Sequence, residues 1–236
     1  MDFLNARWEN LIMANYAIDP AVLTPYLPSG VELDFHEGKT YVSLVGFMFR
    51  KTSLFKIPIP LMGTFEEVNL RFYVKRIIGN EVRRGVVFIS ETVPFQIVAK
   101  LANSLYKEHY ITIPTRHKWE ISDTKKHIEY SWKMKGTWNS LTVNALTTNR
   151  TMTPGSLEEF IFEHYYGYTK VSNTETQEYK VEHPKWNTNE VLDYEVNCDF
   201  GKMYGNDFAF LSKARPDSVV ISEGSPVAVK WKRTNI

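Results

Sequence analysis

The sequence predicts an α+β protein that is mostly β, folded as one domain over residues 1–236 around a barrel-like or sandwich core. Aromatic residues make up 14% of the chain, and such rings favour the pleated surface of strands. Many segments alternate between apolar and polar residues, whereas only two or three repeat at helical spacing. No internal repeat and no low-complexity linker divides the chain. Helices that interrupt a mostly antiparallel sheet are typical of the α+β class.

Three segments carry helix signals. Asp19 before a proline is typical of an N-cap and predicts a short helix over residues 21–27. Residues 94–107 place apolar side chains at helical spacing, with polar side chains on the opposite face. The capping box at residues 156–159 predicts a helix that runs to about residue 166 and ends at Gly167.

The other ordered segments are predicted to be strands. Prolines at positions 58 and 60 indicate an extended loop over residues 55–60, and the polar stretch 169–177 is typical of a surface loop. Two pairs of segments are predicted to form hairpins, namely 68–75 with 82–90 and 219–222 with 227–231. Further strands are predicted over residues 40–49, 110–113, 128–134, 141–146, 179–181 and 191–196.

Charge and motif content exclude several classes of function. Lys and Arg total 28 against 27 acidic residues, so no net positive charge draws the chain to nucleic acid or to an anionic membrane. No phosphate-binding glycine loop, dinucleotide fingerprint or nucleophile elbow is found, and we expect no cofactor. The single cysteine, Cys198, cannot form an intramolecular disulfide, and the N-terminus has no signal-peptide pattern. We therefore expect a cytoplasmic protein.

Three Glu-His dipeptides raise the question of a metal site. Adjacent residues point to opposite faces of a strand, and no pair of histidines has the spacing that places two imidazoles at one metal. A metal would require His109, His164 and His183 to meet from distant segments of the chain. We expect no metal and interpret these histidines as surface or capping residues.

One strand face concentrates polar groups that alternate with apolar residues and therefore project to the same side. These residues are Glu67, Asn69, Arg71 and Tyr73. Two interpretations stay open: a solvated face with a cross-strand ion pair, or a polar interior wall where the arginine fork binds a carboxylate. We name these four residues, with Glu91 on the neighbouring strand, as candidate ligand-binding residues.

Lys100 is the candidate catalytic residue. It shares the polar face of the predicted helix with Lys107. Either these lysines face water, or one of them is desolvated in a pocket, with a lowered pKa, and attacks a carbonyl. We expect the first arrangement, and therefore a ligand that binds without covalent attachment.

Six blocks of sequence resemble the YqjF-like family, a group of bacterial proteins in the acetoacetate decarboxylase-like superfamily. The blocks are RWENLIMANY (7–16), YVSLVGFMF (41–49), FEEVNLRFYV (65–74), RRGVVFI (83–89), VEHP (181–184) and EGSPV (223–227). The resemblance implies a closed or conical antiparallel β-barrel, decorated by a few helices, with a central pocket. The superfamily includes the acetoacetate decarboxylases, in which one of two adjacent lysines forms a Schiff base with a β-keto acid. The corresponding stretch here, residues 91–107, has isolated lysines, and the pair Lys125-Lys126 lies in a predicted polar turn.

The leading hypothesis is a small-molecule pocket protein that binds or transforms a compact anionic or carbonyl-bearing metabolite. One alternative is a Schiff-base lysine enzyme of the decarboxylase or aldol type. Another is a protein-interaction module that uses aromatic strands and the loop over residues 51–61. A closed, polar-walled cavity of roughly 300 Å³ or more would favour the leading hypothesis. Self-association into a homo-oligomer stays open.

Overall fold

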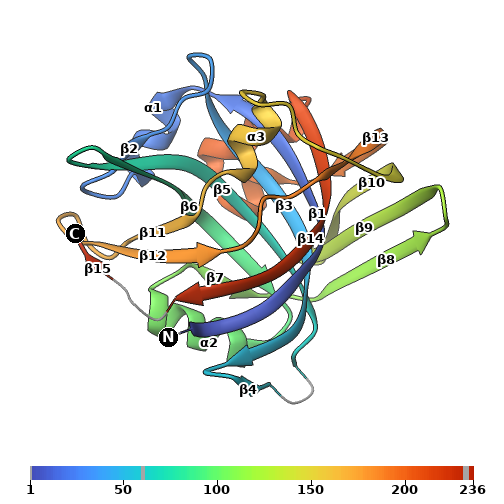
Figure 1. Ribbon diagram of the computed structural model, residues 1–236, viewed down its shortest axis with the longest axis horizontal. Helices are drawn as coiled ribbons and strands as arrows, with labels where there is room; N and C mark the ends of the chain where they lie inside the picture. Colours follow the sequence, from blue (N-terminus) through green and yellow to red (C-terminus); the bar gives the residue numbers. More distant parts are fainter. Residues whose placement is uncertain (1, 60–61, 231–233) are drawn as a thin grey trace.

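The computed structural model describes residues 2–59, 62–230 and 234–236 (Figure 1). In these ranges fifteen strands join one hydrogen-bonded sheet, and a few short helices accompany it. The protein is therefore a mostly-β α+β fold, as the sequence predicts. The strands are β1 (Asp2–Ile18), β2 (Glu32–Leu33), β3 (Thr40–Leu54), β4 (Ile57–Pro58), β5 (Phe65–Ile78), β6 (Glu81–Val93), β7 (Tyr110–Thr112), β8 (Thr115–Ile121), β9 (Lys125–Met134), β10 (Thr137–Arg150), β11 (Tyr166–Lys170), β12 (Thr176–Glu182), β13 (Thr188–Asn197), β14 (Ser218–Lys230) and β15 (Thr234–Asn235).

Two helices begin at the caps that the sequence predicts. The Asp19 carboxylate accepts a hydrogen bond from the Ala21 backbone at 2.8 Å and opens the first helix. The Ser156 hydroxyl accepts from the Glu159 backbone at 3.2 Å and opens the third. The helices are α1 (Pro20–Leu23), α2 (Gln96–Tyr106), α3 (Leu157–Phe162) and α4 (Phe200–Tyr204), with 3-10 helices at Thr24–Tyr26 and Asn206–Lys213.

The strand order places distant parts of the chain side by side. The central path runs β15-β12-β11-β6-β5-β3-β1-β14-β13-β10-β9-β8, and β12 also pairs with β14. Hydrogen bonds therefore connect β12, β11, β6, β5, β3, β1 and β14 in a closed circuit, although the strands do not stand evenly round one axis. Figure 1 shows β1 and β14 crossing the centre of the molecule, α2 at one end of the circuit, and β8 and β9 extending to the side.

Strand β5 separates two apolar regions. Val68, Leu70, Phe72 and Val74 are fully buried in one cluster, which also contains Trp132. The alternate residues of β5 face the inside of the strand circuit, where a second cluster is rich in aromatic side chains. This confirms the predicted alternation. The interpretation of the polar face as solvated is wrong, because Glu67 and Asn69 are almost completely buried.

The predicted surface loop over residues 169–177 is confirmed only in its middle part, residues 171–175, which lie between β11 and β12. Its two ends belong to these strands, and Thr169, Thr176 and Gln177 are buried. At the ends, pairing between the two strands overrides the polar composition. The third helix also ends earlier than predicted, because Gly167 lies in β11, where an added Cβ would lie 2.1 Å from the Tyr179 ring. Part of the predicted loop over residues 55–60 is β4, and its last residue lies outside the described ranges.

The predicted hairpin over residues 219–231 is also wrong, because these residues lie in the single strand β14 as far as residue 230. Strand β1 pairs with it along almost its whole length. Within this strand Gly224 has a φ of +78°, a backbone conformation that only glycine adopts without strain. Pro226 is tolerated because β12 pairs with β14 from Ala228 onward and β13 pairs with it at Ile221. Within the described ranges, no second strand therefore needs the missing proline N–H.

Candidate functional site

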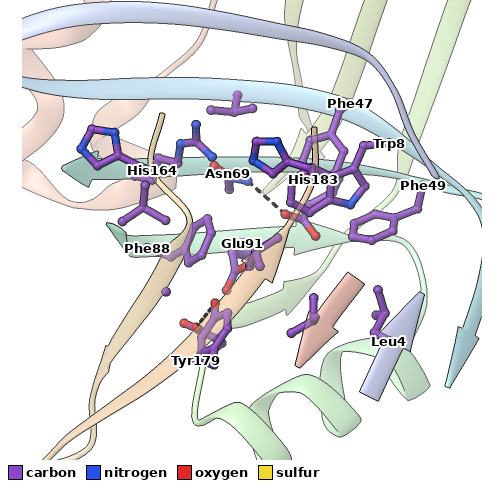
Figure 2. Close-up of a pocket in the computed structure, with 18 of the residues that line it drawn as sticks. Leu4, Trp8, Phe47, Phe49, Asn69, Phe88, Glu91, His164, Tyr179 and His183 are labelled. Carbon is purple, nitrogen blue, oxygen red and sulfur yellow. Dashed lines mark hydrogen bonds between the residues drawn. The ribbon is translucent and has the colours of Figure 1, made fainter. Parts of the chain in front are cut away.

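A cavity of about 120 Å³ lies inside the closed circuit of strands. Side chains from β1, β3, β5, β6, β11, β12 and β14 line it, together with residues that follow α2 and α3. Aromatic and aliphatic groups form most of its wall, and polar side chains gather in a few places (Figure 2). In Figure 2 Trp8, Phe47 and Phe49 stand together on one side, while Asn69, His164 and His183 form a row along β5.

The alternation of β5 brings three predicted residues into the cavity: Glu67, Asn69 and Arg71. The Asn69 amide donates to Glu67 Oε1 at 3.0 Å. The Tyr110 hydroxyl donates to Glu67 Oε2, also at 3.0 Å. Both oxygens of this buried carboxyl group therefore have partners, whereas Asn69 Oδ1 has none among the described residues.

A β-bulge brings Glu91 into the same cavity. Leu70 pairs with Ser90, but Arg71 pairs with Phe88, so Ile89 is the extra residue on β6. A bulge reverses the side to which the following residues point. Phe88 and Glu91, which regular alternation would place on opposite faces, therefore both line the cavity. Glu91 lies opposite Asn69 and is almost completely buried, and its Oε2 has no hydrogen-bond partner in the described structure.

A third buried carboxyl group comes from the segment between α2 and β7. Glu108 Oε1 accepts from the Thr169 hydroxyl and from the Tyr179 hydroxyl, each at 2.7 Å. The neighbouring Tyr110 is fixed by Asn103 of α2, whose side-chain amide bonds the Tyr110 backbone N–H at 2.8 Å and its carbonyl at 2.9 Å. The helix therefore holds Tyr110 in place, while β11 and β12 hold the Glu108 side chain.

Burial of the three carboxyl groups favours their protonated forms. Burial raises the pKa of Glu67 to about 7, although hydrogen bonds from Asn69 and Tyr110 lower it in part. Burial also raises the pKa of Glu108 to about 7, although hydrogen bonds from Tyr179 and Thr169 lower it in part. Burial raises the pKa of Glu91 well above its ordinary range, and the nearby Glu108 and Glu67 raise it further. Burial therefore favours the protonated form of Glu91, which can donate a hydrogen bond, and the other two exchange protons in the range suited to acid–base chemistry.

Arg71 is a cation in this cavity with no ion pair among the residues that the structure describes. One guanidinium nitrogen contacts Met13 Sδ at 3.5 Å, and the group lies 5.6 Å from the centre of the Tyr73 ring. Its Nε is buried without a hydrogen-bond partner. A guanidinium has five N–H donors in a planar fork that matches a carboxylate. This one is free to bind an anion.

His164 follows α3 and is held by an acidic partner. Its Nε2 lies 3.2 Å from Asp34 Oδ2, which also forms an ion pair with Arg84 Nε at 3.0 Å. Burial lowers the pKa of His164, and the bond to Asp34 opposes this only in part. The neutral ring therefore donates Nε2–H to Asp34, and its buried Nδ1 has no partner in the described residues. The prediction of a surface or capping role is wrong for His164.

His183 follows β12 and stacks on Trp186, with ring centres 4.0 Å apart and planes at 14°. Its Nδ1 donates to the Pro184 carbonyl at 2.9 Å. Burial lowers the pKa of the ring, and the charge of Arg71 lowers it further. His183 therefore presents a neutral edge to the cavity beside Asn69 (Figure 2).

Two of the predicted site residues lie elsewhere. Tyr73 is buried next to the cavity without lining it, and its hydroxyl lies 2.6 Å from Ser43 Oγ. Lys100 is exposed on α2 and does not line the cavity. The turn predicted at the lysine pair is also wrong, because Lys126 is 4% exposed in β9 and donates to Asn189 Oδ1 at 2.7 Å. Lys126 does not line the cavity either.

Sequence reasoning missed Glu108, Tyr110, Tyr179 and the roles of two histidines. The three Glu-His dipeptides were the available signal. In each dipeptide one residue lines the cavity, namely Glu108, His164 and His183, while its neighbour does not. In the described part of the chain, no three acidic, histidine or cysteine side chains are grouped closely enough to hold a metal ion. None of the helices there has the length and hydropathy to cross a lipid bilayer.

Solved structures share this fold. An acetoacetate decarboxylase-like enzyme from Sphingomonas wittichii RW1 is 12% identical, with a TM-score of 0.66 over 100% of this chain and 94% of that one. The enduracididine biosynthesis enzyme MppR, complexed with pyruvate, is 10% identical, with a TM-score of 0.67 over 100% and 91%. Acetoacetate decarboxylase from Legionella pneumophila is 11% identical, with a TM-score of 0.65 over 99% and 87%. The chain therefore has the acetoacetate decarboxylase-like fold.

Sequence comparisons point to one family. The uncharacterized protein YqjF of Bacillus subtilis (strain 168) is 32% identical over 72 residues, which cover 30% of this chain and 30% of that protein. The family model DUF2071, described as "Uncharacterized conserved protein (COG2071)", matches residues 5–226. The match covers most of the chain, so this protein belongs to the DUF2071 family.

Proposed function

We propose that the protein binds a compact organic acid in the cavity inside the strand circuit, with the carboxylate of the acid held by Arg71. The observation that carries the proposal is a guanidinium without an ion pair among the described residues, in a cavity whose wall is mostly apolar. The protonated Glu91 lies on the neighbouring strand and supplies a hydrogen bond to a carbonyl or hydroxyl oxygen of the same ligand.

The size of the cavity limits the ligand to a small molecule. Its volume of about 120 Å³ does not reach the roughly 300 Å³ named above as favouring a small-molecule pocket, so the size criterion is not met. A dry cavity of roughly 150 Å³ holds a benzene molecule, so this one suits a ligand of similar or smaller size. Pyruvate is a suitable probe, and it is the ligand in the MppR complex of similar fold.

The proposal is for binding without a covalent bond. None of the residues that line the cavity in the described structure is a lysine, and the candidate Lys100 is exposed. A Schiff base requires a neutral amine next to the carbonyl carbon. The interaction module is the weaker candidate, since the described residues form a cavity that contains a guanidinium without an ion pair.

Isothermal titration calorimetry with pyruvate and with its neutral amide, pyruvamide, tests the proposal. We expect pyruvate to bind and pyruvamide to bind more weakly. Replacement Arg71→Gln removes charge-assisted hydrogen bonds, each worth about 1.5–3 kcal/mol, so pyruvate affinity should fall about 10- to 100-fold. The matched control is Arg116→Gln at an exposed position outside the cavity. Equal affinities of the wild type and Arg71→Gln for pyruvate would contradict the proposal.

A further inference from the structure

A second cavity, of about 90 Å³, lies under α2 and adjoins the first. Six residues line both cavities: Phe3, Leu4, Phe49, Glu67, Ala102 and Tyr110. Apart from Glu67, Tyr110 and Thr52, the wall of the second cavity is aliphatic or aromatic. The two cavities are therefore adjacent and share a wall, and the second is the more apolar of the two.

The wall that the two cavities share contains the hydrogen bond that Tyr110 donates to Glu67. Glu67 and Arg71 are four residues apart on the same face of β5, which corresponds to about 13 Å along a strand. An acid held at Arg71 therefore reaches the second cavity only if a chain of several carbon atoms extends along β5. The geometry sets a minimum length for such a ligand.

Helix α2 covers the outer end of the second cavity with apolar side chains. Val98 and Ala102 face inward, while Ile97 and Leu101 line the cavity and are also 56% and 39% exposed. On the opposite wall, β3 contributes Thr52, which is buried and whose hydroxyl has no hydrogen-bond partner among the described residues. Apart from this hydroxyl and the hydrogen-bonded pair Glu67–Tyr110, the described wall offers only apolar contacts to an occupant.

We propose that the second cavity is a subsite for the apolar tail of the acid whose carboxylate binds Arg71. The inference rests on the proposed function and extends it to a class of ligand: monocarboxylic acids with an unbranched apolar chain. Burial of apolar surface stabilises such a tail by about 0.8 kcal/mol for each methylene group. This corresponds to about fourfold in affinity for each methylene that enters the subsite.

The test is a calorimetric series of straight-chain 2-oxo acids of three to ten carbons, measured below their aggregation limits. Replacement Val98→Phe fills the subsite from α2, and Thr52→Leu fills it from β3. Both residues line only the second cavity. Ser104→Ala, at an exposed position of the same helix, is the matched control. Thermal unfolding shows whether each variant is folded.

We expect the acids of eight to ten carbons to bind the wild type at least tenfold more tightly than pyruvate. Either filling variant should abolish this gain while the affinity for pyruvate stays within twofold of the wild type. Equal affinity along the series, or a gain that both filling variants retain, overturns the subsite and leaves the Arg71 site standing.

A neutral probe separates failure of the subsite from failure of the proposed function. 1-Octanol has an apolar chain without a carboxylate, so it requires the second cavity but not Arg71. Octanol binding that Val98→Phe abolishes and Arg71→Gln retains supports the subsite by itself. If no acid of the series binds the wild type, the Arg71 site fails, and the proposal of a tail subsite for an acid fails with it.

Discussion

Replacing Glu108 by glutamine tests whether the cavity holds protonated carboxyl groups near neutral pH. Glutamine has almost the same shape, and its carbonyl oxygen can still accept the two hydrogen bonds that Thr169 and Tyr179 donate to Glu108 Oε1. The variant therefore removes the titrating proton while leaving these contacts in place. Any change in the pH dependence of stability then reports the ionisation of Glu108.

The sign follows from the raised pKa. Burial raises the pKa of Glu108 from 4.5 to about 7, so between these values the folded state keeps a proton that the unfolded chain has released. The free energy of unfolding of the wild type therefore falls as the pH rises through this window, by about 1.4 kcal/mol per pH unit for one group. Over the whole window from pH 4.5 to about 7, the free energy of unfolding falls by about 3 kcal/mol. Glu67 has a pKa of about 7 and interacts with Glu108, so the two groups release their protons in coupled steps.

Urea unfolding followed by tryptophan fluorescence at pH 4.5, 6 and 8 measures the effect. Relative to the wild type, Glu108→Gln should gain up to about 3 kcal/mol of stability between pH 4.5 and pH 8. Glu190→Gln, at an exposed position in β13, is the matched control. A stability difference between Glu108→Gln and the wild type that is the same at pH 4.5 and pH 8 would refute the reasoning.

Two further predictions concern the backbone of β14 and the lysines. Replacement Gly224→Ala places a Cβ 2.1 Å from the Trp8 carbonyl oxygen at a φ of +78°, so thermal unfolding should show a loss of about 3 kcal/mol or more. Gly79 also has a positive φ, but the space around an added Cβ is open, so Gly79→Ala should lose only about 1–2 kcal/mol of stability. Equal losses of stability in the two variants would show that the contact with Trp8 is unimportant. Incubation with pyruvate and borohydride should leave the intact mass unchanged, whereas a stable adduct on Lys100, absent from Lys100→Ala, would show that the ligand is held covalently.

The sequence predicts one wall of the site well because a strand has a period of two. Glu67, Asn69 and Arg71 follow from alternation in β5, whose opposite face is continuously apolar. The direction of Glu91 could not be derived in the same way, since it depends on the bulge at Ile89. A bulge depends on pairing with a neighbouring strand, and no local pattern in the sequence marks it.

The errors arise where tertiary pairing overrides local composition. The stretch after Glu223 has the residues of a turn, yet β1 pairs with it on one side and extends it into a strand. The polar residues around Thr176 are similarly buried by pairing between β11 and β12. His164 enters the site through contacts with Asp34, which is 130 positions away in the sequence. Such contacts are invisible to any argument based on periodicity.

A crystal structure of the protein grown with pyruvate tests the central claim most directly. We expect pyruvate inside the strand circuit, with its carboxylate oxygens about 2.7–2.9 Å from the guanidinium nitrogens of Arg71. Its keto oxygen should lie within hydrogen-bond distance of the Glu91 carboxyl group. Pyruvate bound outside this cavity, or an Arg71 side chain paired with a protein carboxylate while the cavity holds no pyruvate, would contradict the account.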